Sequence, residues 1–178
     1  GETDISDASR PIKQKEIDQC KAAGIQFIEI PVAFDALTVV INPKNDFAKT
    51  MTVAELKKIW EPAAQGKLKT WKSINPAWPD QKLALFGPGA DSGTFDYFTE
   101  AVVGKSKSSR GDFTASEDDN VLVKGVAGDE GGLGYFGYAY YEENKDILTA
   151  VAIKKDAASK AVLPSKEAIE DGTYTPLA

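Results

Sequence analysis

The sequence predicts an α/β protein with a largely parallel or mixed sheet. Short apolar or β-branched runs alternate along the chain with segments whose apolar residues recur at helical spacing. The 178 residues are 42% apolar and 27% charged, a composition that supports one good core or two small lobes.

The N-terminal part predicts a strand, a helix and a long extended run. Residues 3–9 read as a short strand that leads into a helix, with Ser9 as its N-cap and Gly24 as the glycine that ends it. Residues 25–34 form an extended run interrupted by Pro31, which makes this proline a candidate crossing point between two lobes.

The rest of the chain continues the alternation. Residues 39–41 form an unalternated β-branched run, as expected for a strand buried on both faces. A capping box at 52–55 begins a helix with an apolar face. The other predicted elements are a loop over 67–79, a strand over 82–86, helices that begin at 95 and 116, a strand and short helix over 134–141, a strand over 147–153 and a short helix over 165–169.

The sharpest chemical feature is the sequence Asp-Ser-Gly-Thr at 91–94, between a predicted strand and a predicted helix. The first N–H groups of a helix have no partner within it and carry about half a positive charge. Gly93 allows a ligand to approach closely, and Ser92 and Thr94 add hydroxyl donors, so with Asp91 they suit a tetrahedral oxyanion. A plain N-cap explains the same residues. The spacing matches no Walker A, dinucleotide or hydrolase-elbow motif.

Arginine is scarce, because only Arg10 and Arg110 among the 21 basic residues are arginine. A guanidinium can make two parallel hydrogen bonds to an oxyanion, so each is a candidate ligand, with a surface ion pair as the alternative. Asp7 and Ser9 are further candidates. A carboxylate such as Asp7 could accept a proton from a P–OH group, which fully ionised sulfate cannot give. Capping of the following helix is the alternative explanation for these residues.

Composition argues against several classes of function. A net charge of −6 provides no basic face for nucleic acid. The chain has no histidine, which removes the commonest general base and zinc ligand and argues against most enzyme classes. Helix capping explains the acidic run 117–119, and packing explains the aromatic run 135–141. We expect no cofactor and no metal.

Four blocks, residues 4–12, 87–98, 109–120 and 133–140, resemble the phosphate-binding proteins of high-affinity phosphate ABC transporters. The similarity runs over essentially the whole chain. It implies a type II periplasmic binding protein with two α/β lobes joined by a two-strand hinge. Such a receptor closes on one phosphate ion and delivers it to the membrane permease subunits.

The resemblance also implies site residues. Ser92, Gly93 and Thr94 match the anion cradle of the family, whereas Pro88 and Ala90 stand where some members have an arginine and an aspartate. The guanidinium would therefore come from elsewhere in the chain.

The two arginines, Arg110 and Arg10, are the available sources of that guanidinium. When the sequences are aligned on Pro11, the proton-accepting aspartate of the family falls on Ser9, two residues after Asp7. Which carboxylate accepts the phosphate proton stays open at this point.

The resemblance further implies a division into lobes, with 1–30 and 149–178 as parts of lobe one and 31–148 as lobe two. Family members begin with a further strand and a Gly-Ser loop that supplies phosphate ligands, so we expect reduced or lost affinity in this chain. We expect a monomer outside the cytoplasm, in the periplasm or its equivalent, with a cleaved leader or lipid anchor left open for the full-length protein.

Three other functions stay open. The first is a receptor of the same fold for sulfate, molybdate or tungstate. The second is a carboxylate-based phosphatase, which the missing histidine disfavours. The third is a signalling or scaffolding role through the acidic surface.

Overall fold

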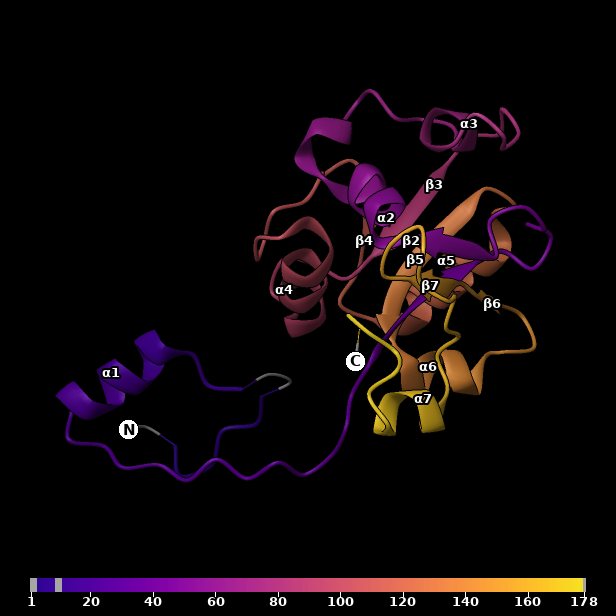
Figure 1. Ribbon diagram of the computed structural model, residues 1–178. Helices are drawn as coiled ribbons and strands as arrows, with labels where there is room; N and C mark the ends of the chain where they lie inside the picture. Colours follow the sequence, from indigo (N-terminus) through magenta and orange to yellow (C-terminus); the bar gives the residue numbers. More distant parts are fainter. Residues whose placement is uncertain (1–2, 9–10, 178) are drawn as a thin grey trace. The chain divides into compact units, whose positions relative to one another are not determined.

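The computed structural model describes residues 3–8 and 11–177, and the chain divides into two compact units (Figure 1). Unit 1 is Gly1–Ala33 and unit 2 is Phe34–Ala178. All the strands of the described residues lie in unit 2. The chemistry predicted at residues 91–94 and at Arg110 therefore belongs to unit 2.

Unit 1 contains the helix α1 (Gln14–Ala22), which ends at Gly24 with a φ of 69°, as predicted. The helix begins later than predicted, because the Glu16 carboxylate accepts the Lys13 N–H at 2.9 Å and closes the first turn there. Ser9, the predicted N-cap, lies outside the described residues.

The strand predicted over 3–9 is wrong for the described residues 3–8, and the extended run 25–34 forms no strand either. A strand needs a hydrogen-bonded neighbour, and none of the described strands pairs with these segments. The apolar side chains of the second segment are accordingly exposed.

Unit 2 is built on a five-stranded mixed sheet with the order β4-β3-β5-β1-β6. The strand β3 is parallel to β4 and β5, whereas β1 is antiparallel to β5 and β6, so the mixed sheet is confirmed. A separate parallel pair joins β2 to β7. The strands are β1 (Leu37–Ile41), β2 (Thr50–Thr52), β3 (Ala84–Gly87), β4 (Thr114–Ala115), β5 (Gly132–Gly137), β6 (Thr149–Ala150) and β7 (Ala152–Lys154).

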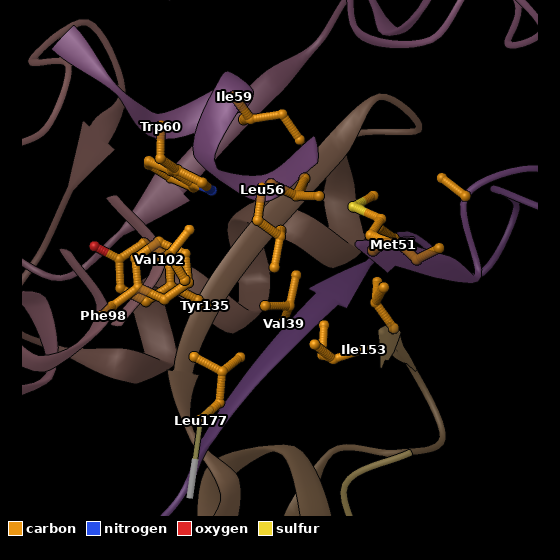
Figure 2. Close-up of a cluster of buried hydrophobic side chains, with 14 of the residues drawn as sticks. Val39, Met51, Leu56, Ile59, Trp60, Phe98, Val102, Tyr135, Ile153 and Leu177 are labelled. Carbon is orange, nitrogen blue, oxygen red and sulfur yellow. The ribbon is translucent and has the colours of Figure 1, made fainter. Parts of the chain in front are cut away.

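The strand β1, which lies between β5 and β6, is fully buried, as its β-branched run predicts, and its side chains alternate between two apolar clusters. Val39 packs in the larger cluster with side chains of α2 (Val53–Trp60) and η2, a π-helical turn (Thr99–Val103), as Figure 2 shows. Val40 packs on the opposite face with α5 (Asp119–Gly128). Helices therefore cover both faces of the sheet.

Other elements that local sequence patterns predicted are present in unit 2, although some of their bounds differ from the predicted ones. The capping box of α2 is present, with the Glu55 N–H bonded to Thr52 Oγ1 at 3.1 Å and the Thr52 N–H to the Glu55 carboxylate at 2.8 Å. The predicted loop 67–79 is wrong in part, because it contains α3 (Trp71–Ile74), whose Trp71 is buried. The other helices are η1 (Pro62–Ala64), α4 (Gly93–Phe98), α6 (Tyr138–Glu143) and α7 (Lys166–Glu170).

The C-terminal segment packs within unit 2. The predicted strand over 147–153 is divided into β6 and β7, which join different sheets. Tyr174 and Leu177 are fully buried, and the Leu37 N–H donates to the Leu177 carbonyl at 2.8 Å. In this chain, residues 149–177 thus share a core with 34–148. The division of a complete receptor into lobes at residues 30 and 148 stays a prediction.

Candidate functional site

The loop 88–92 carries the chain from the carboxyl end of β3 into α4, and binding sites of α/β sheets gather at such ends. Ser92 is the N-cap of α4, because its Oγ accepts the Thr94 N–H at 3.2 Å. The Ser92 N–H donates back to the Gly89 carbonyl at 3.1 Å, which tightens the loop. Gly93 is exposed, while Ser92 and Thr94 are half-buried. Backbone donors and two hydroxyl groups are thus gathered at one helix end.

Two glycines fix the course of this loop. A Cβ atom on Gly87 would lie 3.2 Å from the rings of Phe113 and Tyr135 and 3.4 Å from that of Trp60. A Cβ atom on Gly89 would lie 2.0 Å from Oε1 of Glu117, so this side chain rests against the loop backbone. The end of β3 and the loop after it are therefore both in close contact with their neighbours.

Arg110 is almost fully buried, and all five of its N–H donors face acceptors within the chain. Nε donates to Asp112 Oδ1 at 2.6 Å, and Nη2 to Asp112 Oδ2 at 2.9 Å. Nη1 donates to the carbonyls of Ile59 at 3.1 Å and Leu68 at 3.2 Å, and Nη2 donates to Leu68 at 3.2 Å. An anion could reach this guanidinium only after one of these bonds is broken.

The other predicted site residues are not brought together by the described structure. Asp91 is exposed beside Ser92 in unit 2, and Asp7 is exposed in unit 1. Ser9 and Arg10 lie outside the described residues. Within unit 2, the geometry therefore gathers Asp91, Ser92, Gly93 and Thr94 and assigns Arg110 to a different environment. The anion contacts of Asp7, Ser9 and Arg10 stay predictions.

Sequence reasoning did not single out Lys107, whose ammonium group lies against the loop. Its Nζ donates to the Ala90 carbonyl at 3.1 Å and lies 3.6 Å from Asp96 Oδ1. Ala90 precedes the predicted anion-binding residues, and Asp96 lies in the first turn of α4. Lys105 stands two residues before Lys107, so the sequence offers no signal that distinguishes the second lysine from the first.

The acidic run 117–119 caps a helix, as predicted. Asp118 is the N-cap of α5 and accepts the Asn120 N–H at 2.9 Å. Burial, followed by the nearby charge of Asp118, raises the pKa of Asp119. Among the described residues no group of three or more His, Cys, Asp or Glu side chains is arranged to hold a metal ion.

No helix within residues 3–8 and 11–177 is long and apolar enough to cross a membrane.

The α/β architecture and its mixed sheet are those of type II periplasmic binding proteins. The chain belongs to the PBP superfamily domain family, whose profile matches residues 1–177. The match covers both units.

Three known proteins illustrate the relationship. Protein SphX of Synechocystis sp. is 52% identical over 177 residues, which are 99% of this chain and 52% of that protein. A possible phosphate binding protein from Planctomyces limnophilus has a crystal structure with 53% identity and a TM-score of 0.79, covering 96% of this chain and 59% of its own. A putative phosphate ABC transporter substrate-binding protein from Clostridium perfringens, solved with bound phosphate, has 26% identity and a TM-score of 0.70. The match covers 94% of this chain and 60% of that one. The chain spans about half the length of the curated relative.

Proposed function

We infer that this chain is part of a receptor that binds inorganic phosphate outside the cytoplasm and delivers it to the permease of an ABC transporter. The observation that carries this proposal is the Ser-Gly-Thr turn at 92–94, which caps α4 at the carboxyl end of β3. The names of two similar solved proteins, one of them with bound phosphate, support the same ligand.

The turn offers what a phosphate ion requires. The first N–H groups of α4 add partial positive charge, Gly93 leaves its backbone open to a ligand, and Ser92 and Thr94 bring hydroxyl groups. We place the anion at this turn. We place Arg110 outside the direct contacts, because its donors are already bonded.

A non-catalytic role accompanies this proposal. The matching family is one of binding proteins, and the chain has no histidine to serve as a general base or to activate Ser92. A carboxylate near the ligand would act as an acceptor for the proton of phosphate, and Asp91 is the candidate that lies beside the turn in unit 2.

A phosphate titration of this chain, followed by amide NMR, tests the proposal. We expect the amide signals of Gly93, Thr94 and Phe95 to shift with phosphate and to shift less with equal sulfate. Ser92→Ala should weaken the phosphate effect. Ser165→Ala is a matched control, because Ser165 caps α7 in the same way, with its Oγ accepting the Ala168 N–H at 3.1 Å.

Both substitutions should lower the free energy of unfolding by about 1 kcal/mol through loss of the cap. Only Ser92→Ala should change the phosphate titration. Phosphate shifts that are absent from residues 92–95, or that Ser165→Ala weakens equally, would contradict the proposed site. Stronger binding of sulfate, molybdate or tungstate would reassign the ligand, and turnover of a phosphomonoester would contradict the non-catalytic role.

A further inference from the structure

The main chain at Lys107 is held in an unusual conformation. Among the described residues, Lys107 is the one non-glycine residue with a positive φ, at 65°. Such a conformation is uncommon for a lysine and persists where neighbouring contacts hold it. The contact here is a hydrogen bond of 2.8 Å from the Lys107 N–H to Thr99 Oγ1. That hydroxyl group in turn donates to the Phe95 carbonyl at 2.8 Å, within α4.

From this anchored position the side chain reaches the entry to α4. The ammonium group contacts the loop through Ala90 and the first turn of the helix through Asp96, at 3.1 and 3.6 Å. Asp96 Oδ1 is buried and accepts no hydrogen bond, so the ion pair with Lys107 is its one polar contact among the described atoms. The lysine therefore joins both sides of the loop-to-helix junction.

The charge balance around this junction is negative without Lys107. Asp91 lies in the loop, Asp96 in the first turn of α4, and Glu117 against Gly89. Within the described residues, Lys107 is the one lysine or arginine whose side chain hydrogen-bonds to the loop 88–92. Its charge thus offsets part of the negative charge of the three carboxylates and favours a bound anion.

We propose that Lys107 supplies the positive charge of the anion site at 92–94 and holds the loop that forms it. This assignment rests on the proposed function. It explains how the site can work while Arg110 is fully bonded to Asp112 and backbone carbonyls. The side chain is more than half exposed, and Ala90 and Asp96 face two of the three N–H donors of its ammonium group, so one donor can turn toward a ligand.

The experiment compares four substitutions in the phosphate titration. Lys107→Gln removes the charge and should weaken phosphate binding about tenfold, whereas Lys107→Arg keeps the charge and should change the Kd by less than about threefold. Lys105→Gln is the control, because it removes the same charge two residues away and should change the Kd by less than about twofold. Raising the salt concentration should reduce the difference in the Kd for phosphate between the wild-type chain and Lys107→Gln.

Lys107→Gly separates the effect of the side-chain charge from that of the main-chain conformation at residue 107. Glycine adopts a positive φ without strain, so this variant should keep the main-chain conformation at residue 107 and yet lose phosphate affinity as Lys107→Gln does. If the wild-type chain binds phosphate at 92–95 and Lys107→Gln matches Lys105→Gln, the assignment of Lys107 is wrong and the proposed function stands. If the wild-type chain shows no phosphate effect at 92–95, the proposed function fails and the assignment fails with it.

Discussion

The carboxylate of Asp112 holds the guanidinium of Arg110 at two points, with Nε···Oδ1 at 2.6 Å and Nη2···Oδ2 at 2.9 Å. The same carboxylate accepts the Gly66 N–H at 2.9 Å. Through Arg110 the pair also binds the carbonyls of Ile59 and Leu68. One ion pair thus joins the end of α2, the loop after it and the segment that leads into β4.

Replacing Arg110 should strongly destabilise unit 2. Arg110→Ala removes the guanidinium donors from the Asp112 carboxylate and from two carbonyl groups and should lower the free energy of unfolding by about 3 kcal/mol. Arg110→Lys should recover little of this loss, because an ammonium group cannot bond to Asp112 at two points. Urea denaturation measures both. Lys67→Ala, at an exposed position in the neighbouring loop, is the control and should be nearly neutral.

Acid should weaken the same ion pair. The hydrogen bond from Arg110 lowers the pKa of Asp112 from 3.8 to about 2. Because the pKa in the folded state lies below the ordinary value, the stabilisation is complete above that ordinary value and is lost as the pH falls toward 2. After allowance for the partial exposure of Asp112, we expect a loss of about 1 kcal/mol.

The measurement is the free energy of unfolding of the wild-type chain minus that of Asp112→Asn, followed from neutral pH down to about pH 2. The subtraction removes the titration of other carboxyl groups. A difference that does not change with pH would show that the ion pair contributes nothing in the folded state.

Two glycines of one helix should respond oppositely to alanine. A Cβ atom on Gly125 of α5 would lie 2.4 Å from ring atoms of Phe86, whereas one on Gly128 would meet no atom within 4 Å. Alanine is favoured over glycine in helices by up to about 1 kcal/mol, so Gly128→Ala should be neutral or stabilising. Gly125→Ala should destabilise by about 1–3 kcal/mol, because the Phe86 ring must move. Thermal denaturation checks this order, and a lower Tm for Gly128→Ala than for Gly125→Ala would contradict this packing.

Replacement of two buried tyrosines by phenylalanine should change the stability differently. The Tyr135 hydroxyl group has no hydrogen-bond partner among the described atoms, and burial raises its pKa. Tyr135→Phe should therefore leave the stability unchanged or raise it by about 1 kcal/mol. The Tyr174 hydroxyl group donates to the Leu37 carbonyl at 2.9 Å, so Tyr174→Phe should lower the stability by about 1 kcal/mol. Chemical denaturation of both variants checks the contrast, and equal losses would show that the Tyr135 hydroxyl group is bonded.

Local sequence signals predicted much of the fold. The capping box at Thr52 and the β-branched run of β1 depend on neighbours within a few residues, so their pattern is readable in the sequence. The strands β2 and β4 have three and two residues and carry no usable periodicity. Their pairing depends on distant partners, as Met51 with Ile153 shows. A short strand of this kind is defined by its neighbour.

The candidate site was predictable to the same extent. The Ser-Gly-Thr turn at 92–94 is a local signal, and the structure places it at the start of a helix as expected. The scarcity of arginine marked Arg110 as unusual, but scarcity does not reveal what a guanidinium contacts. Asp112, two residues further on, was the available sign of an internal ion pair. No sequence pattern marked Lys107 as a site residue, because its position depends on the turn that brings residue 107 back to Thr99.

The packing of Gly87 has a consequence for how the protein can evolve. Three aromatic rings, those of Trp60, Phe113 and Tyr135, touch the space where this residue would carry a side chain, and the loop begins at the next residue. A change of volume at any of these rings would displace the backbone at position 87 and, with it, the entry to the loop. Ligand affinity in a lineage of such proteins could therefore drift through substitutions in the interior while residues 92–94 stay unchanged.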